Sequence, residues 1–265
     1  MSEKFQPVYF PRATVFVALL FFSFATLAQQ STVESKVYRF EDLPIEKQDT
    51  RDRRQVLKGS TTDLASFEVH VSTVPAGLAP HLPHTHADEE ELIIVKEGNL
   101  KVTIAGKTTI IGAGSVALAI PGEEHGFENA GDIPVTYYVL KYKSRLPPDL
   151  ARAERAGGSF MINWNDLAAT QTDRGERRNF FERPTSMTGR YEMHVTLLNK
   201  GFNSHAPHTH RAEEIVLLIR GEASMQIGDR HERATAGDLV FLGSNVPHAL
   251  TNTGDGPVEY FAFQW

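Results

Sequence analysis

The sequence predicts an all-β protein made of two tandem domains with the same fold. One pattern of histidines, glutamates and glycines occurs twice in the same order, and apolar and polar residues alternate along many short segments. An alternation with a period of two is typical of strands that bury one face. Glycine, proline, asparagine and aspartate separate these segments, which favours a sandwich or barrel in each half.

The repeat keeps a nearly constant spacing. Matching residues lie 124 positions apart up to His81 and His205, and 123 positions apart at His125 and His248. The first copy therefore has one extra residue, which falls shortly after its paired histidines. Solenoid repeats have periods of roughly 20 to 50 residues, so a period this long indicates a duplicated domain.

The predicted strands follow the repeat, and one helix separates the two copies. Phe67, Val69 and Val71 alternate with polar residues, and the second copy has the same alternation at residues 191–196. Further strands are expected at residues 91–95, 99–104, 115–120, 135–142, 215–219, 223–227, 239–242 and 258–265. A short helix is expected after Asp149 and before Gly157, since proline precedes it and glycine ends it. The predicted organisation is a barrel at 36–142, a helical linker at 143–159 and a barrel at 160–265.

The first 28 residues are expected to be a signal peptide. Lys4 and Arg12 precede an uncharged apolar stretch, residues 13–28, which is shorter than the ~20 apolar residues of a membrane span. Cleavage is expected after Ala28, and the alternative is an uncleaved N-terminal anchor. We expect a periplasmic or secreted protein with no stable membrane association after cleavage. The chain has no cysteine, which excludes disulfides and cysteine-ligated zinc and is compatible with this location.

The charge balance bears on the partners. The net charge is −6, and no basic stripe interleaved with aromatic residues is present. Nucleic acid is therefore not expected, because neutralising phosphates requires clustered lysine and arginine. A small-molecule substrate is the expected partner, and a homo-oligomer is compatible with the sequence.

Each copy offers three histidines and one glutamate as ligands for a divalent metal. The predicted ligands are His84, His86, Glu91 and His125 in the first copy, and His208, His210, Glu214 and His248 in the second. Two histidines one residue apart on a strand project from the same face. When the apolar runs that follow are aligned, Glu91 rather than Glu90 matches Glu214. Imidazoles with one carboxylate favour Mn, Fe, Ni, Co, Cu or Zn over Ca and Mg, with one ion per barrel.

Other polar residues recur at matching positions. His81 and His205 precede the paired histidines, and they either bind a substrate or shuttle protons near the metal, or are solvated residues at the rim. His194, like its counterpart in the first copy, either lines the site or belongs to a surface pair or dimer contact. The arginine pairs at 53–54 and 177–178 are interpreted as charges on edge strands that prevent pairing with other chains: Arg53, Arg54, Arg177 and Arg178.

These residues resemble the cupin superfamily, and both halves do so, which makes the chain similar to a bicupin. The first cupin motif is matched by Gly77, His84, His86, Glu91 and Gly98, and by Gly201, His208, His210, Glu214 and Gly221. The second is matched by Gly114, Pro121, His125 and Asn129, and by Gly237, Pro247, His248 and Asn252, although its inner PxGxxH spacing is not kept. The resemblance covers nearly all of residues 36–265. It implies a jelly-roll-like, double-sheet β-barrel in each half, with the three histidines and the glutamate around a metal.

Three functions are compatible with this sequence. The first is a metalloenzyme acting on a small oxygen-rich organic substrate, of the dioxygenase, isomerase, hydrolase or lyase type. The second is a non-catalytic module that binds a sugar, a uronate or the metal, and the third is a structural or storage protein. Bicupin oxalate decarboxylases usually have an arginine where this chain has His81 and His205, so the carboxylate clamp that the resemblance implies for oxalate chemistry is missing. The chain is also similar to bicupin flavonol dioxygenases of the quercetinase type, and less so to ureidoglycine aminohydrolases, whose metal site departs from three histidines and one glutamate. No catalytic residue beyond the ligands is assigned.

Overall fold

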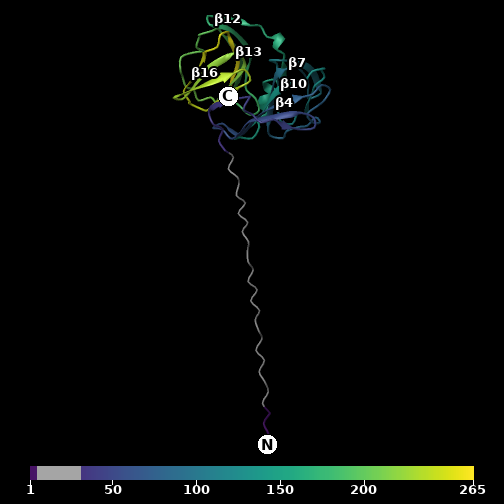
Figure 1. Ribbon diagram of the computed structural model, residues 1–265. Coiled ribbons are helices and arrows are strands. Elements are labelled where there is room, and N and C mark those ends of the chain that lie inside the picture. Colours follow the sequence, from purple (N-terminus) through teal and green to yellow (C-terminus); the bar gives the residue numbers. More distant parts are fainter. Residues whose placement is uncertain (5–30) are drawn as a thin grey trace.

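The computed structural model describes residues 1–4 and 31–265. Apart from residues 1–4, the predicted signal peptide lies outside the described residues. Two β-rich halves lie side by side (Figure 1), which confirms the predicted all-β fold class. Among the described residues, no helix has the length and apolar character that a membrane crossing requires.

Each half consists of a seven-stranded sheet and a three-stranded sheet. In the N-terminal half the sheet orders are β11-β8-β5-β10-β4-β3-β2 and β7-β6-β9; in the C-terminal half they are β1-β18-β15-β20-β14-β13-β12 and β17-β16-β19. Matching strands occupy matching places, as a duplication requires. The two sheets of a half form an open double-sheet barrel rather than one closed cylinder.

The strands of the N-terminal sheets are β2 (Glu46–Lys47), β3 (Asp52–Gly59), β4 (Leu64–Val74), β5 (Glu90–Glu97), β6 (Asn99–Ile104), β7 (Lys107–Gly112), β8 (Val116–Ala119), β9 (His125–Glu128), β10 (Val135–Ser144) and β11 (Phe160–Ile162). Those of the C-terminal sheets are β1 (Lys36–Tyr38), β12 (Thr170–Thr172), β13 (Gly175–Arg183), β14 (Tyr191–Leu198), β15 (Glu214–Arg220), β16 (Glu222–Ile227), β17 (Arg230–Thr235), β18 (Leu239–Leu242), β19 (His248–Asn252) and β20 (Val258–Gln264).

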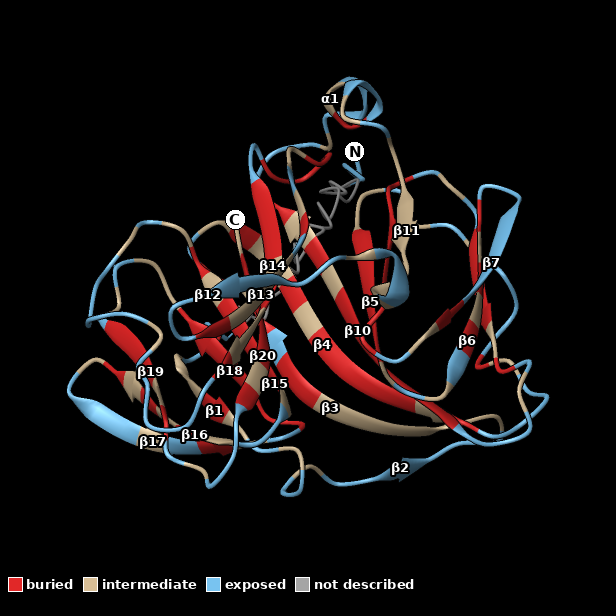
Figure 2. Cartoon of the chain, turned by 90° about the horizontal axis from the view of Figure 1, so that it is seen from above, coloured by how far each residue is buried: buried red, intermediate tan, exposed pale blue. Residues whose placement is uncertain are grey.

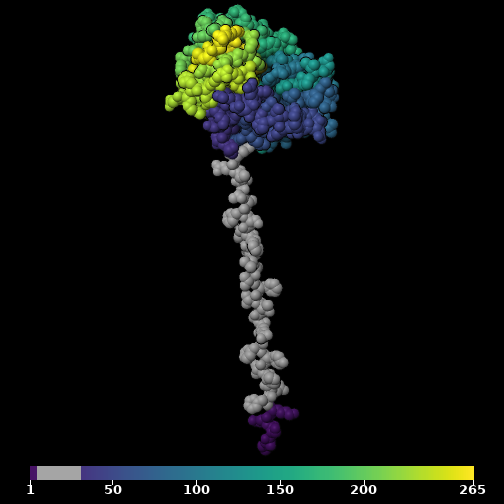
Figure 3. Space-filling view, viewed as in Figure 1, coloured from purple at the N-terminus to yellow at the C-terminus, as the bar shows by residue number. Residues whose placement is uncertain are grey.

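The two halves exchange their first strands. Lys36 of β1 pairs with Phe241 in the C-terminal sheet, and Phe160 of β11 pairs with Leu118 in the N-terminal sheet. The purple N-terminal part of the described fold accordingly lies against the yellow-green half in Figure 3. Residues 36–38 and 160–162 thus pair with the sheet of the other half, although each opens the barrel predicted at 36–142 or 160–265.

The alternation along β4 and β14 separates two environments. Phe67, Val69 and Val71 belong to a core shared by both halves, where the Phe67 ring lies 6.2 Å from that of Phe241. Successive side chains of a strand point to opposite faces, so the polar residues between them face the interior of the barrel. In Figure 2 the buried residues run along β4, β10 and β14, which border this shared core.

The helix α1 (Leu150–Arg155) lies in the predicted linker at 143–159. Asp149 caps it by accepting a hydrogen bond from the backbone N of Arg152 at 2.9 Å. Gly157 and Gly158 follow with positive φ, the conformation that glycine adopts most readily at the end of a helix. The predicted start and end of this helix are confirmed.

Two buried glutamates tie each half to a loop of the other. The Glu90 carboxylate accepts hydrogen bonds from the backbone N of Ser186 at 2.7 Å and from its hydroxyl at 2.6 Å. The Glu213 carboxylate accepts from the backbone N of Thr62 at 2.9 Å and from the Thr61 hydroxyl. Glu90 and Glu213 occupy matching positions at the starts of β5 and β15, so the same contact between a buried carboxylate and a loop of the other half occurs twice.

Candidate metal centres

The four predicted ligands of the N-terminal half lie together. One ligand atom each from His84, His86, Glu91 and His125 fall within 4.8 Å of one another. The Nε2 atom of His86 lies 3.0 Å from Glu91 Oε2 and 3.0 Å from His84 Nε2. The adjacent Glu90 points to the opposite face of β5, toward the interface between the halves, because neighbouring side chains on a strand alternate. The structure therefore places Glu91, and not Glu90, with the histidines.

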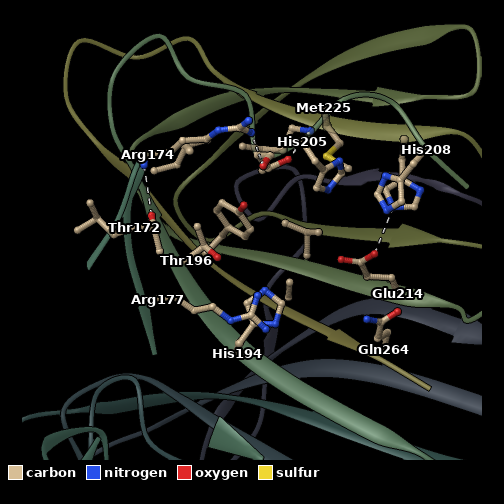
Figure 4. A pocket seen from close by; sticks show the side chains of 18 of the residues that line it. Thr172, Arg174, Arg177, His194, Thr196, His205, His208, Glu214, Met225 and Gln264 are labelled. Atoms are coloured by element: carbon tan, nitrogen blue, oxygen red, sulfur yellow. Dashed lines mark hydrogen bonds and ion pairs between the residues drawn. The ribbon is translucent and has the colours of Figure 1, made fainter. Parts of the chain in front are cut away.

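The second set is similar but more open. The ligand nitrogens of His208, His210 and His248 fall within 4.8 Å of one another. Glu214 Oε2 lies 3.1 Å from His210 Nε2 and 3.2 Å from His248 Nε2, although Glu214 is outside the mutually close group. Figure 4 shows Glu214 reaching from its strand toward the histidine rings. Because β15 supplies the carboxylate and β19 the last histidine, both sheets contribute to the cluster.

Backbone carbonyls orient the histidine rings. Nδ1 lies 3.0 Å from the Glu123 carbonyl in His125 and 2.8 Å from the Val246 carbonyl in His248. A ring that donates from Nδ1 keeps the Nε2 lone pair for a metal. In both residues Nε2 is buried and has no hydrogen-bond partner among the described residues. Buried lone pairs that converge beside a carboxylate fit a divalent metal ion, so the residues present suit the group that the sequence predicts.

The glutamates are held in the ionised form. Burial alone raises the pKa of Glu214, but the hydrogen bond from His210 and the charge interactions with His248 and His210 outweigh it and lower the pKa to about 2. Burial likewise raises the pKa of Glu91, but the hydrogen bond from His86 and the charge interactions with His125 and His86 hold this pKa well below its usual range. The hydrogen bond to Glu214 raises the pKa of His210 above its ordinary value.

We expect the metal-free protein to lose stability as the pH falls from 4.5 toward about 2. The folded-state pKa of Glu214 is depressed, so its contribution is present above its ordinary pKa and is lost as the pH falls through the folded value. His210 has a raised pKa, so its contribution is complete below 6.5 and is lost as the pH rises through that raised value. Urea unfolding between pH 2 and 5 measures the effect. Glu214→Gln should reduce this pH dependence and the exposed control Glu41→Gln should leave it unchanged; equal curves for both variants would contradict it.

A cavity of about 440 Å³ opens beside the second set of histidines. Its lining includes His205, His208, His210, Glu214 and His248, together with polar and apolar side chains from β13, β14, β16 and β20. In Figure 4 the rings of His194 and His208 project into this pocket from different elements. The exposed ring of His205 lies 4.0 Å from that of His208, and the exposed ring of His81 lies 4.5 Å from that of His84.

The structure decides between the alternatives that the sequence left open for His194 and adds polar residues around it that the sequence did not assign. His194 lines the cavity, and its Nδ1 lies 3.0 Å from Glu192 Oε1. Arg177 Nη2 donates to the same oxygen at 2.9 Å, and Gln264 Nε2 donates to Glu192 Oε2 at 2.7 Å. The polar half of the alternation in β14 was the available signal. It did not reveal whether that face meets solvent or the barrel interior.

The interpretation of Arg53 and Arg177 as edge-strand charges is wrong. They lie on β3 and β13, and β2 and β12 pair with these strands on the outer side. Arg53 donates to Glu68 at 2.8 Å, as Arg177 does to Glu192. A strand that is paired on both sides has no open edge to protect, and the two arginines instead hold carboxylates inside the barrels.

A family profile described as "Cupin domain" matches residues 70–141 and 194–263. No curated protein matches the chain. Among solved structures, a Pseudomonas aeruginosa protein described as glyoxylate-induced has a TM-score of 0.69 at 17% identity, over 90% of this chain and 92% of that one. Oxalate decarboxylase from Lactobacillus farciminis, in a formate complex, has a TM-score of 0.66 at 16% identity, over 89% and 87%. Oxalate decarboxylase from Bacillus subtilis, described with Mn(II) centres, has a TM-score of 0.66 at 15% identity, over 89% and 78%. At these identities the likeness concerns the fold.

Proposed function

This chain belongs to the cupin family, with one cupin domain in each half, and on that premise we propose that it is a metal-dependent enzyme for a small oxygen-rich organic substrate. The observation that supports this most strongly is the convergence of imidazole and carboxylate donors beside a cavity of about 440 Å³. The proposed ligands are His84, His86, Glu91 and His125, and His208, His210, Glu214 and His248. One divalent transition metal per barrel is proposed, and Mn is one of the six candidates.

The proposed ion would act as a Lewis acid that polarises substrate oxygens. The residues of the chain supply the rest of the site. Tyr260, Thr196 and Gln264 line the cavity as hydrogen-bonding groups, while Leu250 and Val216 supply apolar walls. A mixed lining of this kind orients a small ligand through a few polar contacts and excludes bulk water from the remainder. His205, exposed at the rim, is placed to bind a substrate group that reaches it.

The reaction type is left among dioxygenase, isomerase, hydrolase and lyase. The fold is shared with oxalate decarboxylases at 15–16% identity. His81 and His205 stand where those enzymes usually carry arginine, which favours a substrate other than oxalate. Purified protein, prepared without chelator, should convert a member of a panel of polyhydroxy acids, flavonols and enols, assayed with and without oxygen. Conversion that persists unchanged in metal-free protein would contradict the proposal.

We also propose that the protein acts in the periplasm or outside the cell, after removal of residues 1–28. Mass spectrometry of protein exported from a bacterial host should find an N-terminus at Gln29. An N-terminus at Met1 in protein that stays with the membrane would support the uncleaved anchor instead.

A further inference from the structure

The mouths of the two barrels differ at one pair of equivalent positions. Arg51 in the N-terminal half corresponds to Gly175 in the C-terminal half, 124 residues later. Arg51 Nη1 lies 3.3 Å from the hydroxyl of Ser72, a fully buried residue on the interior face of β4. Gly175 has φ +150, and a Cβ there would lie 1.9 Å from the carbonyl O of Leu197. A side chain at this position is thus present in the first half and excluded from the second, where the preceding residue, Arg174, lines the cavity and is held by the carbonyl oxygens of Asn203 and Ser204.

The interiors differ as well. Three positions that carry Leu250, Ala262 and Val216 along the C-terminal cavity carry larger side chains in the N-terminal half: Phe127, Val139 and Ile93. The Phe127 ring lies 5.9 Å from both the His125 and Tyr137 rings, so it fills the space beside the histidine cluster. Other lining positions run the other way, since Met225, Leu198, Leu197 and Thr196 correspond to the smaller Val102, Val74, Thr73 and Ser72. Phe127 lies next to the histidine cluster and Arg51 lies at the mouth, so these two side chains have the largest effect on access to the N-terminal cluster.

Equivalent side chains around the two clusters also differ in solvent exposure, and those of the C-terminal half are more exposed. The Glu214 side chain is 14% exposed and that of Glu91 is 4% exposed, while His194 is 16% exposed and His70 is 8% exposed. The cavity of about 440 Å³ is lined by all four proposed ligands of the C-terminal half. The cavity of about 170 Å³ on the N-terminal half is not its counterpart, because Lys101 and Thr103 line it from the opposite face of β6, and it has only His125 of the four ligands in its lining.

We propose that the C-terminal metal centre alone receives the small-molecule substrate, and that the N-terminal centre is closed to it by Arg51, Phe127 and Val139. This inference rests on the proposed function, since it assigns the substrate to one of two proposed metal centres. The closed centre would bind its ion as part of the folded barrel.

The open chamber also indicates the class of substrate. His194 donates from Nδ1 to Glu192, an acceptor held by three further donors, so its Nε2 faces the cavity as a hydrogen-bond acceptor. Arg177 uses Nε and Nη2 for Asn179 and Glu192, and its Nη1 has no partner among the described residues. One acceptor and one cationic donor beside a metal suit a small hydroxy acid or hydroxy ketone. The hydroxyl would donate to His194 and the carbonyl or carboxylate would accept from Arg177.

The test uses the Mn(II)-loaded full chain and benzohydroxamate, a small chelator with two oxygen donors and a ring that needs space. Isothermal titration should give one benzohydroxamate per chain, while metal analysis gives two Mn per chain. His208→Ala/His210→Ala should abolish binding of the probe, and the matched His84→Ala/His86→Ala should keep it within about twofold. Two probes per chain, no binding to fully loaded protein, or loss only in the N-terminal variant would each overturn the inference. Failure of both barrels to retain Mn would instead overturn the proposed function, and this inference with it.

A second pair of variants leaves every proposed ligand intact. Leu250→Phe/Ala262→Val gives the C-terminal chamber the side chains of the N-terminal one and should weaken benzohydroxamate binding at least tenfold, with two Mn per chain unchanged. The reciprocal Phe127→Leu/Val139→Ala should keep the native affinity at the C-terminal site. Native affinity in Leu250→Phe/Ala262→Val would show that these side chains do not control access, and would overturn the inference.

Discussion

Replacing His208 and His210 together by alanine is expected to remove one metal ion per chain and to abolish conversion of the substrate. Both side chains belong to the C-terminal cluster, where the ligand nitrogens lie within 4.8 Å of one another. Losing two of four donors leaves a carboxylate and a single imidazole, too few to hold a transition metal against water. Elemental analysis of protein purified without chelator measures the loss, and the activity panel measures the second effect.

The control for this variant is His231→Ala. His231 is exposed on β17 and belongs to neither cluster, so its removal should leave the metal content at two per chain. A double variant that retained both ions would contradict the proposed ligands, and one that lost its ion and still converted substrate at the native rate would contradict the assignment of the substrate to the C-terminal centre.

The second large effect is a loss of stability when Glu213, which binds a loop of the N-terminal half, is replaced. Glu213 is 1% exposed and accepts hydrogen bonds from Thr61, Thr62, Asp63 and Trp265. Glu213→Ala leaves these donors without their acceptor, and hydrogen bonds to a charged group contribute about 1.5–3 kcal/mol each. Because such losses are not additive, we expect the free energy of unfolding to fall by about 3 kcal/mol.

Chemical denaturation of Glu213→Ala against the native protein tests this prediction. Glu213→Gln keeps one acceptor oxygen and should lose less stability, while the exposed Glu41→Ala should change the free energy of unfolding by less than about 0.5 kcal/mol. If Glu213→Ala were as stable as Glu41→Ala, the carboxylate would not be what holds the loop at residues 61–63.

Much of the fold could be predicted because the sequence contains two copies of one domain, which can be aligned with each other. The constant spacing fixed which residues correspond, and the aligned apolar runs placed Glu91 rather than Glu90 with the histidines, where the structure also has it. Asp149 and Gly157 define the linker helix through local capping, which depends on neighbours in the sequence.

The exchange of β1 and β11 could not be predicted. An alternating pattern indicates a strand, but it carries no information about which sheet the strand joins. The residue pattern of Lys36–Tyr38 is compatible with pairing within its own half and with pairing to β18, and the structure has the second. That choice depends on long-range contacts, which local periodicity does not encode.

The sequence left the role of His194 in the polar wall of the chamber undecided for a related reason. His194 and Glu192 lie on the polar face of β14, and a polar face more often meets solvent than the interior of a barrel. Only the position of β14 beside β13 and β20 turns that face inward. Phe127 and Leu250 are both apolar strand residues in the sequence, and only the fold turns both toward the interior of their barrels, where the Phe127 ring lies beside that of His125.

The most direct test of the proposed metal centres is anomalous scattering from crystals of the full chain loaded with Mn(II), measured on both sides of the manganese absorption edge. Two peaks per chain are predicted, one at bonding distance from His84, His86, Glu91 and His125, and one at bonding distance from His208, His210, Glu214 and His248. Empty density at both clusters in crystals that contain manganese elsewhere would contradict the assignment of these residues as a metal site.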